Sequence, residues 1–339
     1  MDIYILNTLE HGVDITNQLK NQLKIKGIIG LSSKNDTKNI SGFVDVKKNC
    51  RKNHFQFVSL DSYNMKNEND KKKLKKLNID VLLVLGWQRL IPKWLIEKCK
   101  FGAIGIHGSP WGINYGRGRS PQNWSLILGK DIFEISIFRI NEGIDSGRII
   151  ESRKFPLSEF DNIITSYHKS SILISEMIIK NIKKISSNSG HEQKGPTRFL
   201  PQRIPDDGQI DWNRKSLEIY NFIRGQTHPY PGAFSFINKT KIWIWHAIPF
   251  NLKIDHTEKN PGTIIRVFYN KDLLIKTNNG YILINDYTLK PSKFKLKEGM
   301  KMNSINFSKQ MKGIVERHYK KFPKNKLNKE ILKKIETKN

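Results

Sequence analysis

The chain has 339 residues, of which 37% are apolar, and its formal net charge is +28. This length predicts two domains at about 100–200 residues each, and the apolar content is enough for an ordinary core, which excludes wholesale disorder. The two separated cysteines, Cys50 and Cys99, are too few for a disulfide framework or a cysteine-bound zinc site. The sequence has no apolar run of about 18 residues and no basic stretch before its first apolar residues, so it predicts neither a membrane helix nor a signal peptide. We therefore expect a cytoplasmic protein.

The positive charge attracts polyanions such as nucleic acid, a membrane surface or a nucleotide-linked substrate. The lysines are nevertheless spread along the chain, and asparagine and isoleucine are also abundant. This composition is typical of proteins from A/T-rich genomes, and only clustered charge marks a specific patch. Compositional bias is therefore the favoured interpretation, and no membrane partner is expected.

Short apolar runs alternate with polar stretches of helical pattern in the first half of the chain. The predicted strands are residues 3–6, 27–31, 55–59, 80–86, 103–106 and 132–140. The predicted helices are residues 11–23, 71–77, 92–98, 121–128 and 162–186. Residues 80–86, DVLLVLG, have the continuous apolar character of a strand buried on both faces. Strands separated by helices predict an α/β fold with a doubly wound, mostly parallel sheet.

The sequence changes character after a polar, turn-rich stretch. We predict an N-terminal catalytic domain over 1–186, a linker over 187–200, a smaller domain over 201–300 and a basic tail over 301–339 that forms a loosely packed helix. The smaller domain has one predicted helix, 216–225, and strands at 233–237, 241–248, 262–267, 273–277 and 281–287. Five short strands, with a hairpin-type Asn279-Gly280 pair, predict a small β-barrel of the oligonucleotide/oligosaccharide-binding kind.

Four polar, glycine-containing stretches lie at the ends of predicted strands. They are GWQRLIP (86–92), IGIHGSP (104–110), GRGRSPQNW (116–124) and NEGIDSG (141–147). Ligands of open α/β sheets bind outside the carboxyl ends of the strands. The sequence therefore predicts one site at this edge, where backbone groups of the first and last stretch can contact a flat heterocycle.

Two residues in these stretches suit proton transfer. His107 leaves a strand and is followed by small residues, and an imidazole can exchange protons or steady an oxyanion near neutral pH. Asp145 is either a turn residue of Asp-Ser-Gly or a carboxylate that orients His107 and receives a proton. Arg117 and Arg119 either bind an anion or are solvated loop charges. Residue chemistry alone predicts proton transfer on a small ligand.

A family resemblance extends this interpretation. HGSPWGINYGRGRSPQNWSLILGK (107–130) and EISIFRINEGIDSGRII (134–150) resemble the catalytic core of the folate-dependent formyltransferases, which include sugar N-formyltransferases and methionyl-tRNA formyltransferases. PQRIPDDGQIDW (201–212) and IRGQTHPYPGAF (223–234) resemble the start of that family's C-terminal domain. The likeness covers most of residues 1–290.

The resemblance implies 10-formyltetrahydrofolate as co-substrate, no metal, and His107 and Asp145 as the catalytic pair. It implies a pterin site formed by Gly86, Trp87, Gln88, Arg89, Leu90, Ile91, Glu142, Gly143, Ile144 and Asp145. The predicted acceptor-binding residues are Ser109, Trp111, Tyr115, Arg117, Gly118, Arg119 and Tyr230. The arginines would meet a diphosphate, and the aromatic side chains would stack on a base or sugar.

The chain departs from the family at one catalytic position. Gly105 stands where the family has the asparagine of Asn-x-His, and loss of one oxyanion donor costs about 10²–10³ in turnover. Either the backbone near Gly105 or the side chain of Ser109 or Asn123 compensates, or the protein is impaired. The family's Leu-Leu-Pro is also replaced, by residues 110–115.

The favoured acceptor is the primary amine of a nucleotide-linked amino sugar. ISGFVDV (40–46), within the stretch 32–50 that follows the second strand, and IRGQTHPYPGAF (223–234) resemble the sugar enzymes more than the tRNA enzymes. A methionyl-tRNA formyltransferase is the alternative, in which case tRNA is the partner. A second alternative is a catalytically impaired homologue that binds folate or nucleotide. Family members are often homodimers, so a homodimer is possible here.

Overall fold

The computed structural model describes residues 1–32, 37, 40–253 and 260–336. Part of the stretch 32–50 and the last three residues of the predicted tail lie outside the described residues. The chain forms two compact units. The first comprises 1–117, 132–156 and 165–197, and the second comprises 118–131, 157–164 and 198–339. No helix among the described residues is long and apolar enough to span a membrane.

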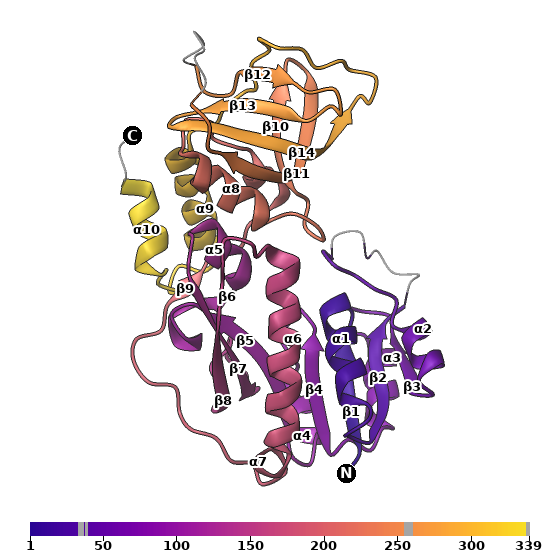
Figure 1. Cartoon of the computed structure of the whole chain (residues 1–339). Helices are drawn as coiled ribbons and strands as arrows, with labels where there is room; N and C mark the ends of the chain where they lie inside the picture. Colours follow the sequence, from indigo (N-terminus) through magenta and orange to yellow (C-terminus); the bar gives the residue numbers. More distant parts are fainter. Residues whose placement is uncertain (33–36, 38–39, 254–259, 337–339) are drawn as a thin grey trace. The chain divides into compact units, whose positions relative to one another are not determined.

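The first unit contains a seven-stranded sheet (Figure 1). Its strands are β1 (Ile3–Asn7), β2 (Ile25–Leu31), β3 (Gln56–Leu60), β4 (Val81–Gly86), β5 (Ala103–Ser109), β7 (Ile132–Arg139) and β8 (Ile149–Pro156), in the order β3-β2-β1-β4-β5-β7-β8. The pairs from β3 to β5 are parallel, whereas β5-β7 and β7-β8 are antiparallel. The predicted mostly parallel α/β fold is confirmed. The edge strand β8 was not predicted, because its apolar residues are interrupted by Glu, Arg and Lys.

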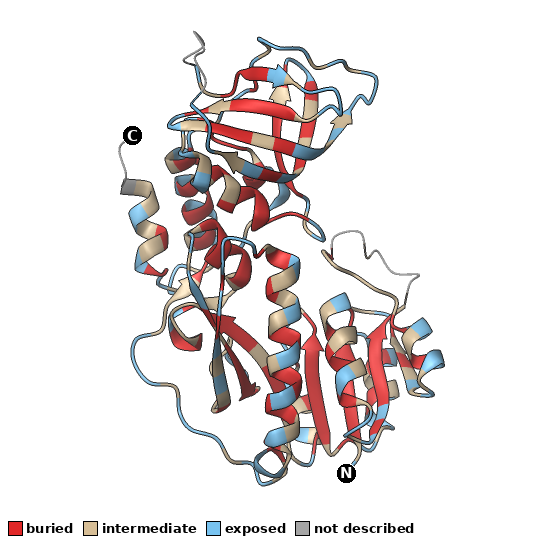
Figure 2. Cartoon of the chain, in the orientation of Figure 1, coloured by how far each residue is buried: buried red, intermediate tan, exposed pale blue. Residues whose placement is uncertain are grey.

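Helices cover both faces of this sheet. They are α1 (Glu10–Leu19), α2 (Lys47–Lys52), α3 (Glu68–Lys75), α4 (Lys93–Lys98), α6 (Ile163–Lys180) and α7 (Ile182–Ser186). In Figure 1, α1 and α6 lie on the face turned toward the viewer. Leu74 of α3 and Leu95 of α4 join the core on the other face, with Leu82 of β4. Because both faces are covered, the central strands are buried along their length (Figure 2), which explains the unbroken apolar run of β4.

The predicted helix 162–186 is interrupted at Asn181. The side-chain Nδ2 of Asn181 donates to the carbonyl oxygen of Met177 at 2.8 Å and also to Glu151. An amide that bonds to its own backbone competes with helix continuation, so α6 ends before this residue and α7 begins after it.

The carboxyl edge of the sheet has a topological switch point between β1 and β4. β2 and β3 continue the sheet on one side of this pair, and β5 continues it on the other. Asn7 and Gly86, the last residues of β1 and β4, pair with each other at this edge. Ligands of open α/β sheets bind at such a point, and the predicted pterin stretch 86–91 begins there.

The second unit contains an antiparallel sheet of five strands, in the order β10-β11-β14-β13-β12. The strands are β10 (Ala233–Ile237), β11 (Thr240–Phe250), β12 (Ile264–Val267), β13 (Leu273–Thr277) and β14 (Gly280–Lys290). They confirm the five predicted strands. The helices of this unit are α5 (Pro121–Ile127), α8 (Ser216–Arg224), α9 (Phe307–Lys321) and α10 (Lys329–Glu336), and the short strands β6 (Arg117–Gly118) and β9 (Phe199–Leu200) pair with each other.

The basic tail differs from the loosely packed helix that its composition predicted. It forms two helices, and the inward faces of α9 and α10 bury Met311, Ile314 and Ile331 almost completely. The buried carboxylate of Asp211 accepts a hydrogen bond from the backbone N–H of Phe307, the first residue of α9, at 2.9 Å. A negative charge at a helix N-terminus is favourable, so the QIDW stretch (209–212) fixes the start of α9.

Candidate functional site

His107 occupies a fixed position near the carboxyl end of β5. Its side chain is only 8% exposed, and Nε2 lies 2.8 Å from the carbonyl oxygen of Gly116. A carbonyl oxygen only accepts hydrogen bonds, so Nε2 carries a proton and donates it. The ring orientation and the tautomer therefore follow from one backbone contact.

Asp145 faces the other ring nitrogen. Its Oδ2 lies 3.4 Å from Nδ1 of His107, and its side chain is 21% exposed. Asp145 follows β7 and has φ +46°, a left-handed conformation that aspartate adopts more readily than most residues. The structure therefore brings the two predicted catalytic residues together. The contact places a carboxylate beside an imidazole nitrogen, an arrangement that suits proton transfer.

The space of the missing asparagine is filled by aromatic and aliphatic side chains. A Cβ atom on Gly105 would lie 2.9 Å from Cγ1 of Ile140 and 3.0 Å from ring atoms of Phe138. These separations are shorter than normal contacts, so Gly105 leaves no vacant pocket. β5 and β7 are closely packed at this position.

The two side chains considered as substitute donors have other partners. Ser109 Oγ donates to the carbonyl oxygen of Gly112 at 2.8 Å and accepts from the Trp111 N–H at 3.1 Å. Asn123 belongs to the second unit, where its Nδ2 donates to the carbonyl oxygen of Gly225 at 2.7 Å. In both residues the polar group stabilises a local turn or helix packing.

The predicted pterin stretch 86–91 is held by hydrogen bonds and an aromatic contact. The backbone N–H and hydroxyl of Thr8 donate to the carbonyl oxygen of Gly86 at 3.0 and 3.1 Å. The Gln88 N–H donates to the Tyr63 hydroxyl at 3.0 Å, and the Trp87 ring meets Tyr63 edge-on at 4.6 Å. Arg89 stacks over the same tyrosine at 4.7 Å. The stretch therefore has a defined shape, with Leu90 exposed.

An ion pair joins the first residue of α4, which follows the 86–91 stretch, to the second stretch that the resemblance assigns to the pterin. Lys93 Nζ lies 2.9 Å from Oε1 of Glu142. The hydrogen bond from Lys93 to Glu142 raises the pKa of the ammonium. Because both side chains are well exposed, this pair contributes orientation rather than much stability.

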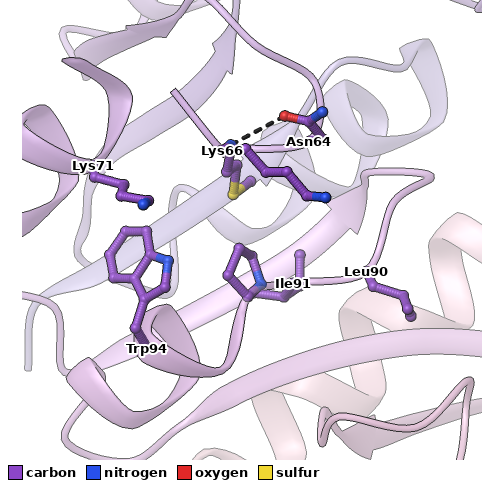
Figure 3. A pocket seen from close by; sticks show the side chains of 8 residues that line it. Asn64, Lys66, Lys71, Leu90, Ile91 and Trp94 are labelled. Atoms are coloured by element: carbon purple, nitrogen blue, oxygen red, sulfur yellow. Dashed lines mark hydrogen bonds between the residues drawn. The ribbon is translucent and has the colours of Figure 1, made fainter. Parts of the chain in front are cut away.

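A hollow of about 370 Å³ lies beside the 86–91 stretch (Figure 3). Its lining combines apolar side chains with two lysines and comprises Asn64, Met65, Lys66, Lys71, Leu90, Ile91, Pro92 and Trp94. Figure 3 shows Lys66 and Lys71 on the side opposite Trp94 and Ile91. An aromatic wall facing two ammonium groups suits a ligand with a flat ring and carboxylates. The sequence analysis missed Lys66 and Lys71, because lysines are spread along the whole chain.

The predicted acceptor-binding residues are divided between the two units. Ser109, Trp111, Tyr115 and Arg117 belong to the first unit, and Gly118, Arg119 and Tyr230 belong to the second. Arg117 is half-buried, and its Nη2 donates to Oδ1 of Asn114 at 2.7 Å and to Oε1 of Gln193 at 2.6 Å. Burial lowers the pKa of the Arg117 guanidinium, and the charge of Asp145 opposes that shift. Over the described residues, no three His, Cys, Asp or Glu side chains gather as a metal site.

The sequence and the fold both match known formyltransferases. The profile of the family described as "Formyl transferase" covers residues 4–180, and the profile "Formyl transferase, C-terminal domain" covers residues 203–307. A methionyl-tRNA formyltransferase of Thermodesulfovibrio yellowstonii is 33% identical over 224 residues, which are 65% of this chain and 69% of that protein.

Solved structures share the fold at lower identity. An N-formyltransferase from Helicobacter canadensis, solved with folinic acid and dTDP-3-aminofucose, has a TM-score of 0.59 at 20% identity and covers 85% of this chain and 99% of its own. HypX from Aquifex aeolicus has a TM-score of 0.61 at 14% identity over 93% of this chain, which spans about half (48%) of the HypX chain. The family profile matches more than half of the chain, and the predicted membership is confirmed: the chain belongs to the formyl transferase family.

Proposed function

We propose that this chain transfers a formyl group from 10-formyltetrahydrofolate to the primary amine of a nucleotide-linked amino sugar. The contact between His107 Nδ1 and Asp145 Oδ2, at 3.4 Å, carries the proposal. It unites a proton-exchanging ring and a carboxylate within the segment that matches the family. Acyl transfer to an amine needs both a donor for the developing oxyanion and an acceptor for the amine proton.

The donor side of the proposal rests on the first unit. The stretches 86–91 and 142–145 would contact the two edges of the pterin, and the exposed Lys93–Glu142 ion pair would help to orient the second stretch. The hollow beside the 86–91 stretch would take the benzoyl-glutamate end of the folate, whose carboxylates complement Lys66 and Lys71. The folinic acid named for the Helicobacter canadensis enzyme supports a folate at this site.

The reaction would proceed by attack of the amine nitrogen on the formyl carbon. The His107 Nε2–H would donate to the resulting oxyanion in place of its present acceptor, Gly116 O. Asp145 would hold the charged imidazole and receive the proton that leaves the amine. Cleavage of the formyl C–N10 bond, with a proton returned to N10, would release the formamide product and tetrahydrofolate.

In this assignment, one side chain donates a hydrogen bond to the oxyanion, whereas the family has two such side chains. Gly105 supplies no side chain, and the Phe138 ring occupies space that an asparagine side chain at this position would need. We infer a turnover lower by about 10²–10³ than that of a site with both donors.

The choice of acceptor rests on two kinds of support. The stretches 40–46 and 223–234 resemble sugar enzymes, and the Helicobacter canadensis structure contains dTDP-3-aminofucose. A tRNA acceptor is the second candidate, supported by the 33% identity to a methionyl-tRNA formyltransferase and by the net charge of +28.

The test is incubation of the chain with 10-formyltetrahydrofolate and a panel of amino-sugar nucleotides, with charged initiator tRNA in parallel. We expect formylated sugar nucleotide and released tetrahydrofolate, detected by mass spectrometry and folate absorbance. Transfer to tRNA alone would favour the second candidate. Folate binding with no transfer to either acceptor would make the chain a catalytically impaired homologue.

A further inference from the structure

The turn that carries Asp145 is held by a side chain from a distant segment. Nε2 of Gln193 donates to the carbonyl oxygen of Asp145 at 2.8 Å and to that of Gly147 at 2.9 Å. One amide thus bonds to the backbone on both sides of Ser146. Because Asp145 has the uncommon left-handed φ of +46°, its conformation persists only if the surroundings hold it.

The same glutamine also bonds to the residue next to the histidine's acceptor. Oε1 of Gln193 accepts a hydrogen bond from Nη2 of Arg117 at 2.6 Å. Arg117 directly follows Gly116, whose carbonyl oxygen accepts from Nε2 of His107. A single side chain therefore contacts the backbone of the Asp145 turn and the side chain of Arg117, the residue after Gly116.

The segment around Gln193 is itself fixed to the first unit. His191 and Ile149 exchange two backbone hydrogen bonds, at 2.8 and 2.9 Å. On the other side, Nδ2 of Asn114 donates to the carbonyl oxygens of Lys194 and Gly195, at 2.9 and 2.6 Å. Gln193 therefore acts from a rigid base, although its stretch has the composition of a linker.

We propose that Gln193 is a positioning residue for formyl transfer, which sets the distance between Asp145 and His107. The proposal rests on the proposed function, because it assigns these two residues the catalytic roles. Gln193 contacts the backbone of the Asp145 turn and the guanidinium of Arg117, and it acts through these residues. Loss of its two donated hydrogen bonds frees the turn, and a misplacement of about 1 Å at a reacting group costs about 10²-fold in rate.

Two variants separate the bonds that Gln193 makes. Gln193→Met keeps the chain length and removes all three hydrogen bonds, whereas Gln193→Glu keeps the acceptor for Arg117 and loses both donors. We expect each variant to lower kcat about 10²-fold while the KM for the folate changes less than about threefold. The matched control is Glu192→Gln, at an exposed neighbour, which keeps the activity of the wild type. A full kcat in Gln193→Glu would overturn the proposal.

A double-mutant cycle asks whether Gln193 acts through Asp145. In the Asp145→Asn background, Gln193→Glu should lower kcat less than about threefold further, since residues acting as one unit are not additive. A further loss of about 10²-fold in that background would refute a positioning role.

A structural readout keeps this proposal apart from the proposed function. Crystal structures of the wild type and of Gln193→Glu should differ in the Asp145 turn, with an Oδ2 to Nδ1 separation in the variant longer than the present 3.4 Å. An unchanged turn would overturn the role of Gln193 even if the wild type transfers no formyl group. An inactive wild type would refute the proposed function alone.

Discussion

The carbonyl oxygen of Gly116 lies 2.8 Å from Nε2 of His107, where a substrate oxygen would accept the same proton. In the proposed reaction, the oxyanion would take the place of this backbone acceptor. A developing negative charge accepts a stronger hydrogen bond than a neutral carbonyl does. His107 would therefore bind the charged oxyanion of the transition state more strongly than the neutral carbonyl oxygen of Gly116. Catalysis requires such preferential binding of the transition state.

Asp145→Asn tests the carboxylate without changing the shape of the turn, because asparagine also tolerates the left-handed conformation. We expect kcat to fall about 10²–10⁴-fold, the range for loss of general acid–base assistance, while the KM for the folate stays close to the wild-type value. Steady-state kinetics with saturating acceptor measures both constants. A kcat within threefold of the wild type would remove Asp145 from the reaction.

Gly105→Asn introduces the family's asparagine at a position where neighbouring side chains leave no room for it. The new Cβ atom would lie 3.0 Å or less from Ile140 and Phe138, so we expect a loss of about 1–3 kcal/mol in the free energy of unfolding from overpacking. Urea denaturation measures this loss.

The matched variant, Gly105→Asn with Phe138→Leu, should recover part of the stability by making room for the side chain. Equal stability of Gly105→Asn and the wild type would contradict the close packing of β5 against β7 at Gly105.

Lys66 and Lys71 should affect the binding of the folate and not the rate of the chemical step. We expect the double change to Gln to raise the KM for a triglutamate folate about 5–30-fold, at roughly 0.5–1 kcal/mol for each of the two partly exposed ion pairs, with kcat unchanged. Lys72→Gln, at an exposed position of α3 next to Lys71, is the control. An unaltered KM would mean that the hollow does not hold the glutamate end of the donor.

Most of the fold could be predicted because its signals are local. The buried run of β4 and the alternating pattern of β7 each identify a strand without knowledge of its neighbours. The edge strand β8 and the break in the helix at Asn181 could not be predicted from local patterns, because both depend on tertiary contacts. The packing of α9 and α10 was likewise hidden by their lysines, since burial of Met311 and Ile331 follows from the arrangement of the helices.

The candidate site was predictable only where residues follow strands. His107 and Asp145 could be paired because strand ends meet at one edge of a sheet. Gln193 lies in a loop and Asn114 in a short 3-10 helix (Ile113–Tyr115), and the composition of these segments carries no signal for the contacts with Asp145 and with residues 194–195. The packing of Phe138 against Gly105 is equally invisible in the sequence, because the pairing of β5 with β7 sets it.

His11 makes the stability of the chain depend on pH. Burial lowers its pKa from 6.5 to about 4, with a smaller effect from His168, and Nε2 has no partner among the described residues. Between these values the unfolded chain binds more protons than the folded chain. Stability is therefore complete above about pH 6.5 and falls as the pH drops toward 4.

The corresponding test compares urea unfolding at pH 7.5 and 4.5. We expect the wild type to lose about 2–3 kcal/mol more than His11→Phe over this interval. The phenyl ring keeps the contact with Tyr167, 5.1 Å away in the wild type, without a titrating group. Equal losses in the two proteins would show that His11 does not titrate between these values.

The most direct test of the central claim is the rate of formyl transfer by the wild type and by His107→Asn, measured as tetrahydrofolate released in the presence of an amino-sugar nucleotide. We predict transfer by the wild type and a loss of at least about 10²-fold in the variant, with circular dichroism unchanged. Transfer by His107→Asn at the wild-type rate would contradict the account, because the imidazole between Gly116 and Asp145 would then have no part in the reaction.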